Sequence, residues 1–312
     1  MKNKFDSAIA IKTGCGLLAG ILAPGIAHAC ACGCGVFDVG TSSMFPQGEG
    51  GMAYFGYAFQ DQFRNWNGTS QASAADNEDK QILTDYFNVG VQYMFNSSWG
   101  AQLQVPFAYR YFKKEDAGKT VSTKWGSLGD IRVQGIYTGF SPDASTGVTF
   151  GFKLPTGNDN YNPSVVDRDT QIGTGSTDIL LGGFHRGHLT PDDMWDWFAQ
   201  TELDVPALIQ AGYRPGVELN SAAGIDYKGW SLGGVRVSPV LQAIFSYRSS
   251  DSGDAAASQD SGYERLLLSP GVEFHVHPVK IYADVELPVF QHVNGNQLVA
   301  PVLVKLNLSY MF

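Results

Sequence analysis

Three cysteines lie close together near the start of the chain, at Cys30, Cys32 and Cys34. Thiolates at this spacing could bind a soft cation such as Cu(I) or Zn(II). A Cys-x-Cys pair could instead close a small, strained and easily reduced disulfide. The spacing is not the paired C-x2-C of a structural zinc module. Three thiols cannot all pair within one chain, so a metal site, an intermolecular bond and docking of a partner protein are all open.

A second candidate metal feature is the pair His275 and His277, which a strand period of two places on one face beside Pro278. Two histidines at i and i+2 can chelate a cation, but the sequence identifies no third ligand. The alternative is a pair of hydrogen-bonded histidines in the interior. No cofactor is firmly implied, and a soft metal ion at the cysteines is the one candidate.

Nothing in the sequence predicts an enzyme. The segment most similar to a catalytic His/Ser pair is Gln291-His292-Val293-Asn294-Gly295, but the residue two positions after His292 is not a serine. No other residues supply a nucleophile, a base and an orienting group together. The formal net charge is −9 and no basic patch is present, so nucleic acid is not an expected partner.

The start of the chain reads as a secretory signal peptide over residues 1–29. Lys2, Lys4 and Lys12 form a basic region, a short apolar run follows, and Ala27-His28-Ala29 offers a cleavage site. Ala29-Cys30-Ala31 is a second such site, and cleavage after Ala31 would remove Cys30. Export to an oxidising compartment would allow the cysteines to form a disulfide. We expect residues 30–50 to form a periplasmic Cys- and Gly-rich segment that could plug the domain formed by residues 51–312.

The rest of the chain alternates apolar and other residues with a period of two. Segments of about ten such residues, bounded by turn residues, are typical of a transmembrane barrel. The last one ends in Tyr310 and Phe312 on one face, as does the terminal strand that the barrel-assembly machinery reads. The predicted strands are 51–60, 83–95, 99–111, 128–140, 147–154, 177–185, 195–205, 217–227, 235–247, 266–276, 279–287 and 302–312. We therefore predict an all-β fold, a transmembrane antiparallel β-barrel of about 12 strands.

The connections between these strands alternate in length. The short ones are 96–98, 141–146, 187–193, 228–230 and 277–278, and the long ones are 61–82, 113–127, 155–176, 206–216, 248–264 and 288–301. Outer-membrane barrels have short periplasmic turns and long external loops. This parity predicts that both termini are periplasmic and that the wall contacts outer-membrane lipid. A soluble β-sandwich is the alternative, but it would not need an apolar face on every strand.

Charged residues are only 16% of the chain and aromatic residues 12%, with 37 glycines, as expected for a wall that is apolar outside and polar inside. Charged side chains cannot face hydrocarbon without a cost of roughly 2–4 kcal/mol each, so they should line the lumen. A structural lattice and a polar path for solute are both compatible with this placement. The predicted lumen and solute-path residues are Arg110, Asp130, Arg132, Lys153, Asp178, Glu202, Asp204, Glu218, Arg236, Glu273, Asp284 and Glu286.

Three glycine-rich motifs carry a family resemblance. They are Ser127-Leu128-Gly129-Asp130, Leu154-Pro155-Thr156-Gly157 and Gly173-Thr174-Gly175-Ser176-Thr177-Asp178. In this order they resemble a family of outer-membrane transporters linked to the meta-pathway of phenol degradation, itself distantly like outer-membrane channels for hydrophobic compounds. Asp130 and Asp178 could be latch points for an external loop that folds inward.

Taken together, these features predict a channel in the cell outer membrane for passive uptake or efflux of small compounds. The resemblance implies that the cargo is apolar or aromatic. The alternative function is a metal- or redox-linked barrel whose cysteine segment binds copper or zinc, or docks a periplasmic partner. A barrel that conducts nothing and only displays its loops is a third reading.

Overall fold

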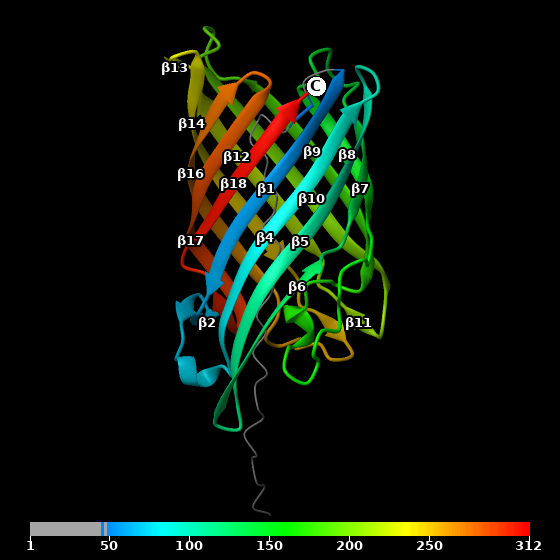
Figure 1. The fold of residues 1–312 in the computed structure, drawn as a ribbon, viewed down its shortest axis with the longest axis vertical. Helices are drawn as coiled ribbons and strands as arrows, with labels where there is room; N and C mark the ends of the chain where they lie inside the picture. The colour runs from blue at the N-terminus through cyan, green and yellow to red at the C-terminus, as the bar shows by residue number, and fades with distance from the viewer. Residues whose placement is uncertain (1–44, 47–48) are drawn as a thin grey trace, which may run out of the picture.

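The structure is a computed structural model that describes residues 45–46 and 49–312. Twelve antiparallel strands follow one another around a closed wall, and the first pairs with the last (Figure 1). They are β1 (Gly50–Gln62), β4 (Asp79–Met94), β5 (Trp99–Asp116), β7 (Arg132–Tyr137), β8 (Thr146–Lys153), β9 (Ser176–His188), β10 (Trp195–Ile209), β12 (Glu218–Tyr227), β14 (Val235–Arg248), β16 (Tyr263–Val276), β17 (Val279–Val299) and β18 (Leu303–Met311). The predicted barrel and its strand number are confirmed.

The two ends of the barrel differ. We call the end where β1 begins and β18 ends the turn end, and the opposite end the loop end (Figure 1). The described short elements outside the main wall are β2 (Arg64–Gly68), β3 (Ser70–Gln71), β6 (Lys119–Leu128), β11 (Tyr213–Arg214), β13 (Trp230–Leu232), β15 (Ser252–Gly253) and the 3-10 helices η2 (Ala74–Asp76) and η3 (Arg168–Thr170). Within residues 45–46 and 49–312, no helix is long and apolar enough to cross a membrane.

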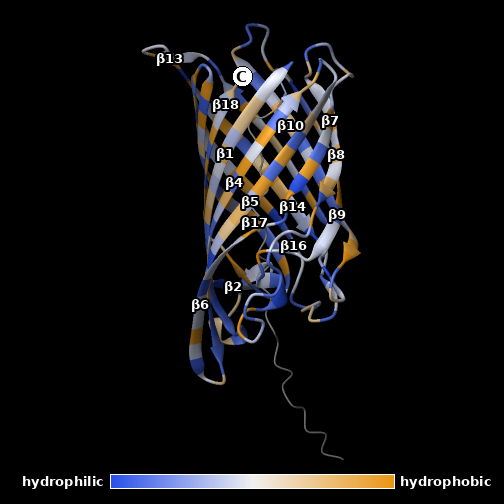
Figure 2. Ribbon diagram, turned by 45° about the vertical axis from the view of Figure 1, so that its right-hand side comes forward, coloured by the Kyte–Doolittle hydropathy of each residue, from blue (hydrophilic) through white to orange (hydrophobic). Residues whose placement is uncertain are grey.

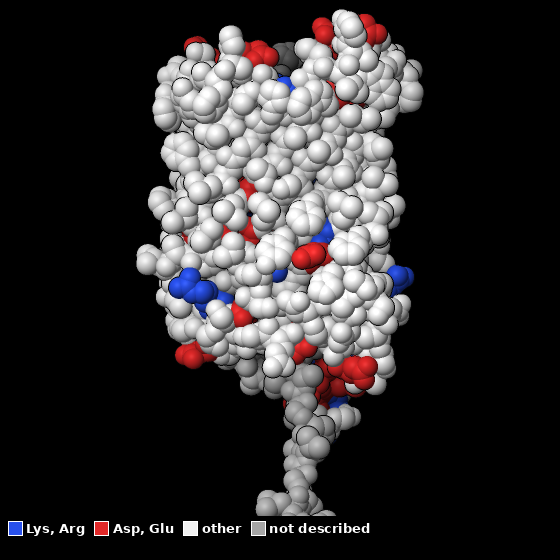
Figure 3. Space-filling view, turned by 180° about the vertical axis from the view of Figure 1, so that it is seen from behind, with Lys and Arg blue, Asp and Glu red and all other residues white. Residues whose placement is uncertain are grey.

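Side chains alternate between the outer surface and the lumen along each strand. Val89 and Val91 of β4 are exposed on the outside, whereas Gln92 faces inward and is buried. Figure 2 shows this alternation as stripes of contrasting hydropathy along the wall. Uncharged side chains cover most of the wall in Figure 3, and acidic ones gather at the turn-end rim and around the loops. This is the surface that a barrel presents to hydrocarbon.

Several strand boundaries differ from the sequence prediction, and two of the differences have a clear physical reason. The predicted strand 128–140 is only β7, because Leu128 ends β6, which forms a hairpin with β5 beyond the wall. The residues between, Gly129 to Ile131, leave the ladder. The predicted strand 279–287 continues as β17 to Val299, past Pro288. A register shift opposite Leu266 and Leu267 lets the strand pass a proline that cannot donate a ladder hydrogen bond.

Candidate functional site: the lumen and its constrictions

The three glycine-rich motifs meet in space around Asp130. Its Oδ1 accepts a hydrogen bond from Gly157 N (2.9 Å), and its Oδ2 accepts from Thr174 N (2.8 Å) and Thr174 Oγ1 (2.6 Å). Thr156 Oγ1 donates to Gly129 O (2.8 Å) and accepts from Ile131 N (2.9 Å). Asp130 therefore ties both ends of the loop over residues 154–175 to the wall, and it lies before β7 rather than on a strand.

Glycine is required where the two ends of this loop cross. Gly173 N donates to Asn158 O (2.9 Å), and a Cβ at either Gly157 or Gly173 would overlap the backbone of the other. Any larger residue would push the two ends apart and move Thr174 away from Asp130. The close approach of the two backbones thus explains why glycine occupies position 157 of the second motif and position 173 of the third.

Arg110 holds the middle of the same loop inward. This arginine is almost completely buried, and its guanidinium donates to Thr84 Oγ1 (3.0 Å), Tyr86 OH (3.0 Å) and the carbonyl of Thr170. A buried guanidinium needs such acceptors, because an unpaired buried charge is costly. The contact fixes η3 against the β4–β5 wall, so the loop covers part of the lumen at the loop end.

Arg168 joins this loop to the next one along the chain. Its guanidinium lies 4.2 Å from the ring centre of Tyr213 and donates to Asp159 Oδ2 (3.1 Å) and Thr174 O (2.7 Å). Tyr213 donates in turn to Asp251 Oδ2 (2.6 Å), and burial raises the pKa of its phenol well above the usual range, so it stays protonated. The loop end is therefore covered by several loops that contact one another, and not by a single isolated loop.

Predicted lumen charges form a network across five neighbouring strands, which we call the waist. Arg132 contacts Glu202 and also Asp204 (3.2 Å), and Lys153 contacts Asp178 and also Asp204 (3.5 Å). The register aligns them, because Arg132 lies opposite Lys153, and Lys153 opposite Asp178. Glu218 lies opposite Asp204 and completes the waist on β12.

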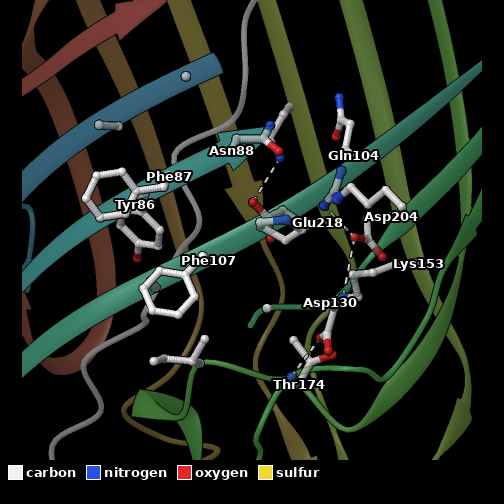
Figure 4. A pocket seen from close by; sticks show the side chains of 18 of the residues that line it. Tyr86, Phe87, Asn88, Gln104, Phe107, Asp130, Lys153, Thr174, Asp204 and Glu218 are labelled. Carbon is white, nitrogen blue, oxygen red and sulfur yellow. Dashed lines mark hydrogen bonds and ion pairs between the residues drawn. The ribbon is translucent and has the colours of Figure 1, made fainter. Parts of the chain in front are cut away.

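A cavity of about 220 Å³ lies between the waist and the inward loop (Figure 4). On one side, small or apolar residues form part of the wall, among them Gly56, Ala58, Pro106 and Ala108, beside polar Tyr86 and Asn88. On the other side are charged waist residues; Figure 4 shows Lys153 beside Asp204, and Asp130 against Thr174. The chamber can therefore hold a small molecule with an apolar and a polar side.

A second cavity of about 90 Å³ follows toward the turn end. Gln104 lines both cavities, and the second one is lined by four further glutamines, Gln92, Gln102, Gln134 and Gln200. Phe45 and Pro46, the described part of the N-terminal segment, lie at its far side inside the lumen. Phe45 packs in a buried cluster with Met94, Ile136, Phe184, Phe198, Val240 and Tyr282.

The remaining predicted lumen residues lie apart from the waist. Asp284 accepts from Ser269 Oγ (2.6 Å) and Tyr282 OH (2.8 Å), and Glu286 pairs with Lys305 (3.5 Å). Arg236 lies opposite His275 near the turn end, and Glu273 lies opposite Ser238. The structure thus brings six of the twelve predicted residues together in the waist, places Arg110 and Asp130 at the inward loop, and distributes the other four along β14, β16 and β17.

The candidate metal ligands are only partly described. Cys30, Cys32 and Cys34 lie outside the described residues, as do the signal peptide and most of the segment over residues 30–50. His275 is the penultimate residue of β16 and faces the lumen, but His277 lies in the following turn and is exposed, so the two do not share a strand face. In residues 45–46 and 49–312, no group of three His, Cys, Asp or Glu is arranged to hold a metal.

Sequence reasoning missed the apolar cluster around Phe45. Phe184 and Phe198 occupy positions that alternation assigns to the lumen, and both are buried there. The sequence did indicate this cluster, because aromatic residues interrupt the alternation at positions where polar residues are expected.

Asp130→Asn is expected to loosen the inward loop. The amide keeps one acceptor oxygen, but its NH2 would face the backbone donor of either Gly157 or Thr174, and hydrogen bonds to a charged group contribute about 1.5–3 kcal/mol. Trypsin should then cut after Arg168, which is protected in the wild type, roughly tenfold faster or more. Timed digestion followed by mass spectrometry measures the rate. Asp143→Asn, in a turn at the other end, is the matched control, and equal rates in both variants would contradict the role of Asp130.

The closed twelve-stranded wall, apolar outside and charged inside, defines the fold of outer-membrane β-barrels. The chain is similar to an outer-membrane channel from Pseudomonas putida F1, with 12% identity, a TM-score of 0.61, and coverage of 89% of this chain and 100% of that chain. It is also similar to the β domain of the Bordetella autotransporter BrkA, with 14% identity, a TM-score of 0.50, and coverage of 85% and 100%. At these identities the likeness establishes the fold alone.

No protein-family model matches the chain, and no curated protein matches it. The link to the meta-pathway of phenol degradation therefore stays a prediction from the three motifs.

Proposed function

We propose that the protein is an outer-membrane channel through which small apolar or aromatic compounds diffuse passively. In this proposal the loop end faces the exterior, the turn end faces the periplasm, and the apolar wall contacts outer-membrane lipid. The channel-like fold supports it, since the similar Pseudomonas putida structure is an outer-membrane channel. The absence of a catalytic triad in the sequence supports transport over hydrolysis.

One observation carries the proposal, namely that the two lumen cavities adjoin at Gln104 and follow one another along the barrel. A barrel that only displayed loops would gain stability by filling this space with packed side chains, as small barrels do. Here instead a chamber is kept between the waist and the loop, and the small residues Gly56 and Ala58 line it. The lumen therefore has room for a solute.

The two ends of this path would regulate passage differently. At the loop end the cover is held by Asp130 and Arg110, so it would narrow the entrance permanently. At the turn end Phe45 fills the lumen through apolar packing alone, apart from one hydrogen bond at Pro46 O. A stopper of this kind can leave without breaking a charged network. We infer that Phe45 and Pro46, in the N-terminal segment, form the constriction that opens.

Planar-bilayer currents of refolded protein test the proposal. We expect a chain beginning at residue 30 to show small or rare openings, and a chain beginning at residue 51 to conduct more, because the stopper is gone. The same bilayers with mock-refolded detergent serve as the control. Silence in both chains would overturn the channel function, and equal conductance in both would overturn the role of the N-terminal segment as stopper.

A further inference from the structure

The contacts of Phe45 describe an aromatic-ring site in the barrel wall. Its ring stacks on Phe184, with centres 4.9 Å apart and planes 5° from parallel, and meets Phe198 edge-on at 6.1 Å. These are the two favourable geometries of aromatic pairs. Both partners belong to the wall, on β9 and β10, whereas Phe45 comes from the separate N-terminal segment. We call the space between Phe184 and Phe198 the ring site.

The wall is shaped to accommodate these rings. A Cβ added at Gly147 would overlap the ring of Phe184, and one added at Gly224 would overlap the ring of Phe198. Each aromatic side chain therefore lies over a glycine of a neighbouring strand, and the glycine keeps the ring close to the wall. This arrangement leaves a slot in which a third planar ring fits, lined at its sides by Ile136 and Val240.

A basic group lies next to the ring site. Arg186 Nη2 donates to Pro46 O (3.1 Å), the carbonyl one residue beyond the bound ring. Among the ion pairs of the described residues, none involves Arg186 or Lys280, and Asp143 and Asp196 act on Arg186 only from beyond 4.0 Å. Arg132, Lys153 and Lys305 farther along the lumen all have a carboxylate partner. The arginine thus has only neutral carbonyl acceptors for its side chain.

The Phe45-Pro46 segment that occupies the ring site indicates which small molecule would fit there. Phe45-Pro46 offers a planar ring in the slot and an oxygen acceptor to the guanidinium, and a small aromatic carboxylate carries the same two groups in one molecule. Its two oxygens are charged and can accept two parallel N–H bonds from the Arg186 guanidinium, which a single backbone carbonyl cannot do. Lys280 is already influenced by the carboxylates of Glu273 and Asp226 as well as by Arg186, so we assign the guest's carboxylate to Arg186 alone.

We propose that the ring site binds small aromatic carboxylates, with the ring between Phe184 and Phe198 and the carboxylate on Arg186, and that Phe45-Pro46 competes for the same place. This inference rests on the proposed function, because it names the class of cargo for that lumen. It makes the stopper a competitive occupant that cargo can displace.

Isothermal titration calorimetry on the full refolded chain tests this binding without requiring transport. Benzoate is the probe, and benzyl alcohol is the neutral match of the same size. We expect Phe45→Ala to bind benzoate about tenfold more tightly than the wild type does, and about tenfold more tightly than it binds benzyl alcohol. Adding Arg186→Gln should abolish the preference for benzoate, and adding Arg186→Lys should keep most of it. Arg64→Gln, at the loop end and exposed, is the control.

Equal affinity for the two probes in Phe45→Ala would overturn the carboxylate assignment. A benzoate preference that survives Arg186→Gln would overturn the role of Arg186. If the proteins bind benzoate but no variant conducts, the channel function fails while the site stands. If they conduct but bind neither probe, the site fails while the channel stands.

Discussion

Lys153→Met is expected to lower the free energy of unfolding by about 3 kcal/mol, because it leaves buried Asp178 without a cation and Asp204 with Arg132 alone. Asp178 and Asp204 are 1% and 6% exposed, and one oxygen of each already lacks a hydrogen-bond partner. Methionine has a similar length and apolar stem, so packing changes little and the charge is the main difference. Guanidinium unfolding of the lipid-reconstituted protein, followed by tryptophan fluorescence, measures the loss.

Lys228→Met is the matched control for this variant. Lys228 pairs with Asp196 near the turn end, but its side chain is 29% exposed, so its removal should cost about 1 kcal/mol or less. Adding Asp178→Asn to Lys153→Met should restore part of the lost stability, since one buried charge disappears. If Lys153→Met unfolds within about 0.5 kcal/mol of the wild type, the waist is a solvated solute path and not a structural lattice.

Phe45→Ala in the full chain is expected to shift the lumen toward its open form. Burial of a phenylalanine side chain contributes about 1.5–3 kcal/mol, so its loss should reduce the occupancy of the stopper roughly 10- to 150-fold. Single-channel recordings should then show longer or more frequent openings at unchanged step size, since the wall itself is the same. The barrel should keep its stability, because Phe45 belongs to no strand.

Phe140→Ala is the control for the stopper. Phe140 lies in a turn at the same end, is 60% exposed and packs against Tyr137 on the outer side. Its removal should leave the recordings unchanged. Openings of Phe45→Ala that match those of the wild type in duration and frequency would show that the ring does not limit passage.

The two constrictions have different physical origins, and this affects how each responds to cargo. The loop-end cover rests on a carboxylate and a buried guanidinium that each satisfy several partners. Removing one partner leaves a buried charge, so this cover opens at high cost. The turn-end stopper rests on aromatic packing, which a ligand of the same shape can replace one for one. A lumen closed in this way admits a ring-bearing solute more readily than a solute without a ring.

Sequence alone determined the class of fold. A period of two on every segment fixes which side chains face outward, and low charge content with alternating loop lengths leaves a closed antiparallel barrel as the consistent solution. The sequence also predicted the strand order and the number of strands. It predicted the inward position of four waist residues as well, namely Arg132, Lys153, Asp178 and Asp204. Alternation is a local property, so one chain can reveal it without knowledge of its neighbours.

Only the tertiary structure decided what the inward residues do. Asp130 and Thr174 are 44 positions apart, and Arg132 and Asp204 are 72 apart, and no local pattern encodes which loop returns into the lumen. The ring site depends on β8, β9, β10 and β12 being neighbours, since Phe184 needs Gly147 beneath it and Phe198 needs Gly224. Period and charge are written along the chain, whereas partners are set by strand register and barrel closure.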